Sequence, residues 1–226
     1  EKTANMALAA KRLIESGVYG ADGKPVECLI GSTSISCRAE AAKVDAEFAA
    51  QNVIATLSVT PVFSYGTETL DFSPHTIKAV WGFNGTERPG AVYLACAMSG
   101  YAEYGLPAFS VYGQNVQDLN DDEIPGDVAE KILVFARCAL AVGEMREKSY
   151  LSIGGVAMGI AGSFLEPNFL KDYFGMHAEW VDMSEVQRRL QKRIYDAEEY
   201  EKAMRWVREN IREGKEYYNK PSVRHT

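Results

Sequence analysis

The run TIKAVWGFNGTERPGAVYLACAMSGYAEY, residues 76–104, changes from the pattern of a strand to the pattern of a helix. Its first part, residues 76–81, is mostly apolar and β-favouring, which predicts a buried strand. A glycine-rich polar turn follows, and Pro89 suits the first residue of a helix that we expect over 90–104. Another apolar run predicts a strand over 106–112. The order strand, helix, strand predicts a right-handed βαβ unit with parallel strands.

The sequence on both sides of this unit continues the alternation. Before residue 148 we expect helices and strands in turn, with helices over 2–16, 38–50 and 127–147 and strands over 26–30 and 52–62. This order predicts an α/β fold: a doubly wound, mostly parallel sheet with helices on both faces. Two further βα units follow, with a short helix over 169–174, a strand over 178–182 and helices opened by Ser184 and Asp196. Two strands are too few to bury both faces of a sheet, so we expect a second α/β domain that is incomplete.

Composition and charge limit the classes of function. The 226 residues are 46% hydrophobic and carry a net charge of -7, which is typical of a globular domain and argues against a nucleic-acid surface. The four cysteines form no C-x-x-C pair, so neither a zinc knuckle nor a disulfide framework is indicated. No apolar run approaches the length of a membrane span, and the first 17 residues do not resemble a signal peptide. We therefore expect a cytoplasmic protein with no membrane partner.

A second glycine-rich turn lies in SYLSIGGVAMGIAGS, residues 149–163. An apolar β-type run breaks there into four glycines, Gly154, Gly155, Gly159 and Gly162. Their spacing matches neither the dinucleotide fingerprint nor the phosphate-binding P-loop. A turn of this kind either packs against a neighbouring helix or lets the main chain face a ligand.

Titratable residues give no catalytic cluster by spacing. The three histidines, His75, His177 and His225, lie far apart and show no metal-binding motif. Asp182 and Glu185 form a carboxylate pair where a strand ends and a helix begins, a place where α/β folds present ligands. An acid in a first helical turn also stabilises the helix without any catalytic role, and that alternative is favoured here.

Two aromatic pairs follow neighbouring strands. Phe63 and Tyr65 come after one strand, and Trp81 and Phe83 after the next. Open α/β folds bind small molecules at this edge, and aromatic faces suit the CH groups of a sugar. These rings are candidate substrate contacts, while packing in the core is an alternative that the sequence leaves open.

Several runs resemble the L-fucose isomerase family of bacteria. They are Val59-Thr60-Pro61, YGTET at 65–69, WGFNGTERPGAVY at 81–93 and the run 149–163, and the resemblance covers essentially the whole chain. It implies a cytoplasmic, homohexameric, manganese-dependent aldose-ketose isomerase. Such an enzyme interconverts L-fucose and L-fuculose, and often D-arabinose and D-ribulose, by an enediol mechanism. No nucleic-acid partner is implied.

The resemblance also implies a division of roles along the chain. Residues 1–147 would be a first N-terminal domain that caps the substrate and builds the oligomer, and 148–226 the opening part of a second. Family members are longer, and their metal ligands and catalytic groups match no position here. We therefore expect no catalytic or metal-binding residue in this chain, Mn²⁺ bound by residues outside it, and no activity of this piece alone.

The substrate-binding residues expected in this chain are Phe63, Met158, Tyr65 and Trp81. The resemblance gives Met158 and Phe63 a substrate-lining role, whereas Tyr65 and Trp81 come from the aromatic pairs. The family often carries tryptophan where this chain has Phe63, which keeps a ring for stacking without the indole N–H. In the hexamer this first domain would close over the active site of a neighbouring subunit.

A different class of function is an alternative. The chain could be a non-catalytic α/β module that binds a sugar or a nucleotide through the glycine-rich turn and the aromatic edge. That hypothesis predicts a folded monomer of 226 residues with a saturable ligand. The isomerase hypothesis predicts an inactive piece with an unfinished sheet edge that is prone to association.

Overall fold

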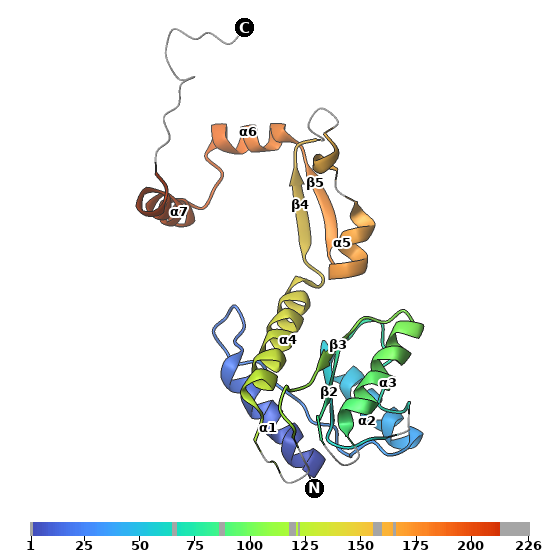
Figure 1. The fold of residues 1–226 in the computed structure, drawn as a ribbon. Helices are drawn as coiled ribbons and strands as arrows, with labels where there is room; N and C mark the ends of the chain where they lie inside the picture. Colours follow the sequence, from blue (N-terminus) through green and yellow to red (C-terminus); the bar gives the residue numbers. More distant parts are fainter. Residues whose placement is uncertain are drawn as a thin grey trace. The chain divides into compact units, whose positions relative to one another are not determined.

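The structure is a computed structural model that describes residues 2–64, 67–85, 89–117, 121, 123–155, 160–164 and 166–212. The chain forms two compact units, one of residues 1–148 with 172–176 and the other of 149–171 with 177–226. Both combine parallel strands with helices, which confirms the predicted α/β class (Figure 1). None of the helices in the described ranges has both the length and the apolar run needed to cross a membrane.

The first unit is built on a three-stranded parallel sheet. Its strands are β1 (Ala55–Thr60), β2 (Ile77–Gly82) and β3 (Ala108–Val111), in the order β1-β2-β3. In the register of the ladders, Val59 pairs with Trp81 and Trp81 with Val111. Because the strands are parallel, their carboxyl ends meet at one edge of the sheet.

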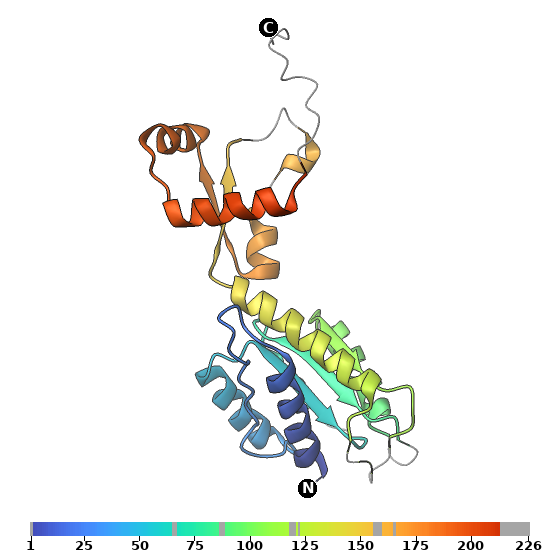
Figure 2. The same cartoon turned by 90° about the vertical axis from the view of Figure 1, so that its left-hand side faces the viewer.

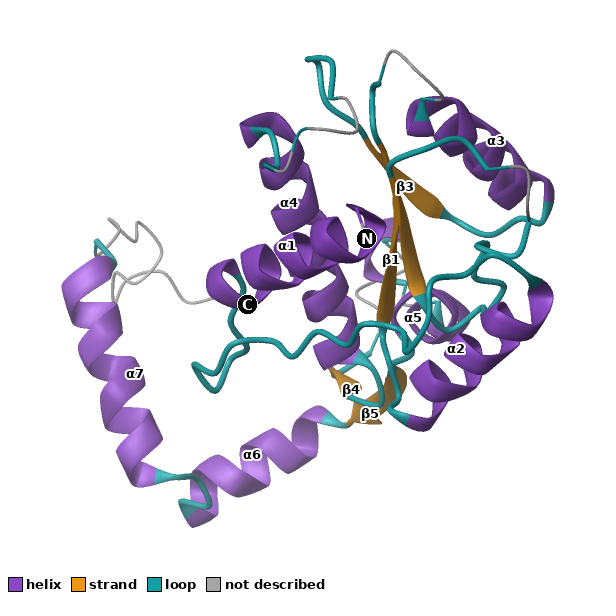
Figure 3. Ribbon diagram, turned by 90° about the horizontal axis from the view of Figure 1, so that it is seen from below, coloured by secondary structure: helices purple, strands orange, loops and turns teal. Residues whose placement is uncertain are grey.

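Helices cover both faces of this sheet, as the alternation predicts. They are α1 (Lys2–Gly17), α2 (Arg38–Ala50), α3 (Gly90–Glu103) and α4 (Gly126–Met145). Figure 2 shows α1 and α4 side by side, and Figure 3 shows them on the opposite side of the strands from α3. Alternate residues of β2 serve the two faces: Ala79 and Trp81 join the core with α1 and α4, while Val80 joins the core with α3.

A buried lysine lies on β2 beside the α3 core. Lys78 is 2% exposed, and its Nζ donates to the carbonyl oxygen of Thr76 at 2.7 Å, to the hydroxyl of Thr76 at 3.1 Å and to the carbonyl oxygen of Ser73. Burial lowers the pKa of Lys78, and the nearby carboxylate of Asp71 partly offsets the shift. Lys78 lies near the amino ends of the strands, away from the edge where ligands bind in such folds.

The predicted strand over 26–30 is wrong. This segment pairs with no strand in the described part of the chain, although Val26 and Cys28 pack against the core as alternate residues of a strand would. Side chains of α1 pair with its backbone instead. The amide of Cys28 donates to the Glu15 carboxylate at 3.0 Å, and Lys11 Nζ donates to the carbonyl oxygen of Cys28. These bonds satisfy the groups that a ladder would otherwise pair.

The second unit contains a parallel pair, β4 (Ser149–Ile153) and β5 (His177–Val181). The helices of this part of the chain are η1 (Ala161–Ser163), α5 (Pro167–Phe174), α6 (Met183–Lys192) and α7 (Ala197–Asn210). Among its described residues Leu170 is the one large apolar side chain that is buried, while Leu151 and Trp180 are half exposed. Two strands are too few to enclose a core of their own.

Candidate functional site

The carboxyl ends of β1 and β2 and the start of α3 form the candidate site. β1 ends at Thr60, β2 ends at Gly82, and α3 begins at Gly90. Open α/β sheets bind ligands outside the carboxyl ends of their strands, which makes this edge the natural place for a small molecule.

Backbone contacts join the segments of this edge. The amide of Phe83 donates to the carbonyl oxygen of Thr60 at 3.2 Å, and the amide of Ala91 donates to the carbonyl oxygen of Phe83 at 2.9 Å. An antiparallel bridge links Val62 to Pro89. The turn after β1, the turn after β2 and the first turn of α3 therefore hold one another in place.

Phe63 lies in the turn after β1. Its side chain is partly buried against the core that α3 forms with Val80 and Leu70. Tyr93 belongs to the same core, and burial raises its pKa to about 12. A ring held in this way at the sheet edge can offer an apolar face to a neutral sugar.

Trp81 and Phe83 lie in the core. Both are 0% exposed, and their ring centroids are 4.7 Å apart with the rings tilted by 35°. The indole N–H of Trp81 has no hydrogen-bond partner within the described part of the chain. The structure thus places Trp81 among core residues, and its contact with a substrate stays a prediction.

Tyr65 and Met158, the other two predicted substrate contacts, lie outside the described residues. Of the glycine-rich turn that contains Met158, the structure describes the beginning. β4 ends at Ile153, and Gly154 has a φ of +88°, a conformation that glycine adopts readily. The amide of Gly154 donates to the carbonyl oxygen of Val181 at 2.9 Å, so Gly154 still bonds to the neighbouring strand β5.

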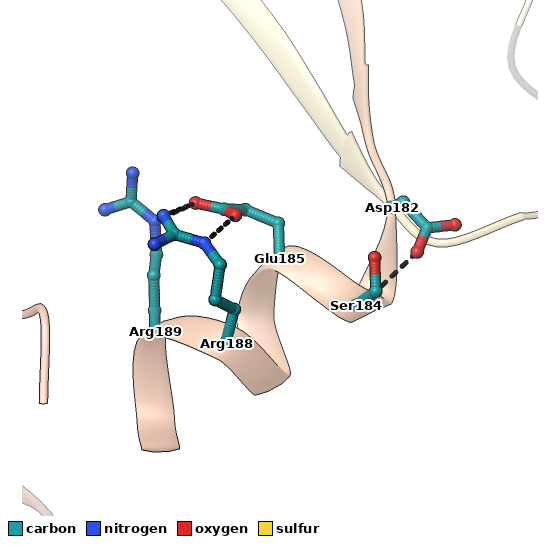
Figure 4. A network of polar contacts seen from close by, with 5 residues as sticks. All are labelled: Asp182, Ser184, Glu185, Arg188 and Arg189. Carbon is teal, nitrogen blue, oxygen red and sulfur yellow. Dashed lines mark hydrogen bonds and ion pairs between the residues drawn. The ribbon is translucent and has the colours of Figure 1, made fainter. Parts of the chain in front are cut away.

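The carboxylates of Asp182 and Glu185 serve the helix that follows them (Figure 4). Asp182 is the N-cap of α6 and accepts from the amide of Ser184 at 2.8 Å, so the helix is capped two residues earlier than predicted. Glu185 pairs with Arg188 at 2.6 Å and with Arg189 at 2.8 Å. Hydrogen bonds from these two guanidinium groups lower the pKa of Glu185 to about 2. This geometry favours the structural role over the catalytic one.

Metal chemistry has no support from the described residues. They contain no group of three or more His, Cys, Asp or Glu that could hold a metal ion. His75 is exposed in the turn before β2, His177 begins β5, and His225 is outside the described ranges. No metal-dependent step is therefore assigned to these residues.

Gly82 and Gly90 have a structural role that the sequence pattern does not reveal. Their lack of a side chain lets α3 approach the ends of β1 and β2 backbone to backbone. The Pro-Gly pair at the start of α3 is a signal for a helix start, but it does not reveal this contact.

The first unit is thus an open α/β domain with helices on both faces of a parallel sheet and a candidate small-molecule site at the carboxyl ends of its strands. The family model of the first N-terminal domain of L-fucose isomerase matches residues 1–147, and that of the second N-terminal domain matches 148–226. The chain belongs to the L-fucose isomerase family.

Individual relatives agree with this assignment. The chain is 58% identical to an L-fucose isomerase of Clostridium perfringens over 95% of its own length and 36% of the relative's. It is 52% identical to those of Bacteroides thetaiotaomicron, over 99% of the chain and 38% of the relative, and of Vibrio vulnificus, over 98% and 38%. The chain therefore spans well under half the length of these relatives.

Proposed function

We propose that the protein containing this chain is an aldose-ketose isomerase that interconverts L-fucose and L-fuculose. The observation that carries the proposal is the match of both N-terminal domain models, in order, over residues 1–147 and 148–226. Identity of 58% to a relative named L-fucose isomerase supports the same substrate. D-Arabinose, with D-ribulose as its product, is proposed as a second substrate pair.

The proposed role of this chain is to bind the sugar and build the assembly, without supplying the reacting groups. Phe63 offers its ring for stacking at the sheet edge, and Met158 and Tyr65 are proposed to complete the lining. Trp81 packs against Phe83 in the core, and it is proposed as a further substrate contact through its indole ring. The acid-base groups and a manganese ion are proposed to lie elsewhere in the longer protein, which we propose to be a cytoplasmic homohexamer.

The test is ketose formation from L-fucose by the full-length parent protein. Activity that is lost on treatment with EDTA and restored by Mn²⁺ would support the proposal. The 226-residue chain alone, assayed in parallel, is expected to give no product. A well-folded parent that converts neither L-fucose nor D-arabinose would refute the proposal, and a non-catalytic sugar-binding module would replace it.

The role of Phe63 has its own test in the same assay. A stacking contact is worth about 0.5–1.5 kcal/mol, so Phe63→Ala is expected to raise KM about twofold to twelvefold. Phe63→Trp retains a ring and is expected to keep KM close to that of the parent. Equal KM values for the parent and Phe63→Ala would exclude a substrate contact at this position.

A further inference from the structure

Two helices of the first unit begin with the same pair of residues in different surroundings. α3 follows Pro89 with Gly90 as its first residue, and α4 follows Pro125 with Gly126 as its first residue. Both prolines are N-caps with no side-chain cap, and their φ angles are similar, -66° at Pro89 and -56° at Pro125. The sequence therefore gives the two glycines the same local role.

Only one of these two glycines is confined by its surroundings. A Cβ atom at Gly126 would meet nothing within 4 Å. A Cβ atom at Gly90 would lie 1.9 Å from the carbonyl oxygen of Thr60 and 2.8 Å from the amide nitrogen of Phe83. Both of these atoms belong to the backbone, so no side-chain rotation can relieve the overlap.

The contact of Gly90 is continuous with the position of Phe63. Thr60 ends β1, and the chain reaches Phe63 after Pro61 and Val62. The bridge from Val62 to Pro89 fixes the same turn from the residue before Gly90. The Phe63 side chain also packs against the core to which α3 contributes Tyr93 and Leu94. A shift of α3 away from Thr60 would therefore move both the backbone and the packing surface of Phe63.

We propose that Gly90 is a positioning residue for Phe63: its direct backbone contact with Thr60 sets where the Phe63 ring stands at the sheet edge. This inference rests on the proposed function, in which Phe63 stacks on the sugar. To accept a Cβ atom at residue 90, Thr60 and α3 must separate by about 1 Å or more. A displacement of about 1 Å at a group that positions the substrate is large enough to weaken its contact with the substrate.

The test compares Gly90→Ala with the matched variant Gly126→Ala in the full-length parent. Gly90→Ala is expected to raise KM for L-fucose by up to the factor seen for Phe63→Ala, with kcat within about twofold, because the contact serves binding in the ground state and the transition state alike. Gly126→Ala is expected to leave both constants unchanged. A KM for Gly90→Ala equal to that of the parent would overturn the inference.

Combination with Phe63→Ala separates positioning from a general loss of stability. If Gly90 acts through Phe63, the double variant Gly90→Ala/Phe63→Ala should have the KM of Phe63→Ala alone, within about twofold. Effects of the two substitutions that multiply would show that Gly90 acts by another route, and would overturn the inference.

Hydrogen exchange tests the geometry without any substrate. In Gly90→Ala the amides of Phe83 and Ala91 and the segment 60–64 should exchange faster, whereas Gly126→Ala should leave them unchanged. Unchanged exchange in Gly90→Ala would overturn the inference even if the parent proved active. A parent that converts no sugar would refute the proposed function, while the exchange result would still decide whether Gly90 holds the turn of Phe63.

If Gly90→Ala fails to fold, Val62→Gly provides a second perturbation that adds no overlap. Glycine at position 62 makes the turn that is bridged to Pro89 more flexible. This variant is also expected to raise KM, but by a smaller factor than Gly90→Ala. A folded Val62→Gly variant with the KM and the exchange of the parent would also count against the inference.

Discussion

Replacement of Lys78 by methionine tests how the buried lysine of β2 contributes to stability. Two effects oppose each other. Burial of the Lys78 ammonium group lowers the stability of the unsubstituted chain through desolvation, and methionine would remove this cost. Against this, the variant leaves the carbonyl oxygens of Ser73 and Thr76 and the hydroxyl of Thr76 without their donor. Methionine has a similar length and is apolar, so packing changes little.

The lost hydrogen bonds are expected to dominate. A hydrogen bond to a charged group contributes about 1.5–3 kcal/mol, and Lys78 makes such bonds to three acceptors. Ser73 and Thr76 are only partly buried, so water can reach some of the freed acceptors. After the gain from removing the buried charge, we expect Lys78→Met to lower the free energy of unfolding by about 2–4 kcal/mol.

Urea unfolding followed by tryptophan emission measures this change. Trp81 is 0% exposed, whereas Trp180 and Trp206 are 56% and 58% exposed, so the shift of emission on unfolding reports mainly on the first unit. The control is Lys131→Met: Lys131 is exposed, and its Nζ donates to the carbonyl oxygen of Tyr112 at 2.7 Å. That variant is expected to lose less than about 1 kcal/mol.

The lowered pKa of Lys78 also predicts that the free energy of unfolding depends on pH. The folded-state pKa of Lys78 is lowered, so between that pKa and the ordinary value of 10.5 the unfolded chain binds more protons and stability rises with pH. In Lys78→Met this rise of the free energy of unfolding with pH should be absent.

A Lys78→Met variant whose free energy of unfolding equals or exceeds that of the chain with Lys78 would refute the reasoning. The cost of burying the charge would then be larger than the free energy that its hydrogen bonds contribute.

Three further changes are predicted. Ile132→Ala, at a 0% exposed site of α4, should cost about 2–5 kcal/mol in urea unfolding, and Val134→Ala, at a half-exposed site of the same helix, less than about 1 kcal/mol; similar losses would place the core elsewhere. The ion pairs of Glu185 should persist above pH 4.5 and be lost as pH falls through about 2, seen as a carboxyl titration by NMR that moves toward 4.5 when either arginine is replaced by alanine. Asp196→Ala removes the acceptor for two amides at the start of α7 and should cost that helix about 0.5–2 kcal/mol, measured by faster exchange of its first-turn amides; unchanged exchange would contradict the cap.

Most elements could be predicted from periodicity and end signals. α2 has the predicted bounds, and the strands and other helices differ from prediction by a few residues at their ends. The strand predicted over 26–30 failed because a strand needs a neighbour, and residues of α1 pair with this backbone instead. The turn after β1 places Phe63 at the sheet edge, and Trp81 packs in the core; whether either ring contacts a substrate stays a prediction.

The sequence by itself determined the α/β class and most elements, because periodicity and local end signals are written in neighbouring residues, and its longer runs resemble those of the family. The tertiary structure alone decided which of the two Pro-Gly helix starts contacts the backbone of the sheet. Pro89-Gly90 and Pro125-Gly126 have the same local pattern. Of the two glycines, only Gly90 lies against the backbone of a strand, at Thr60 of β1. That contact joins residues 30 positions apart in the chain, and no local pattern encodes such an approach; packing of α3 onto the sheet creates it.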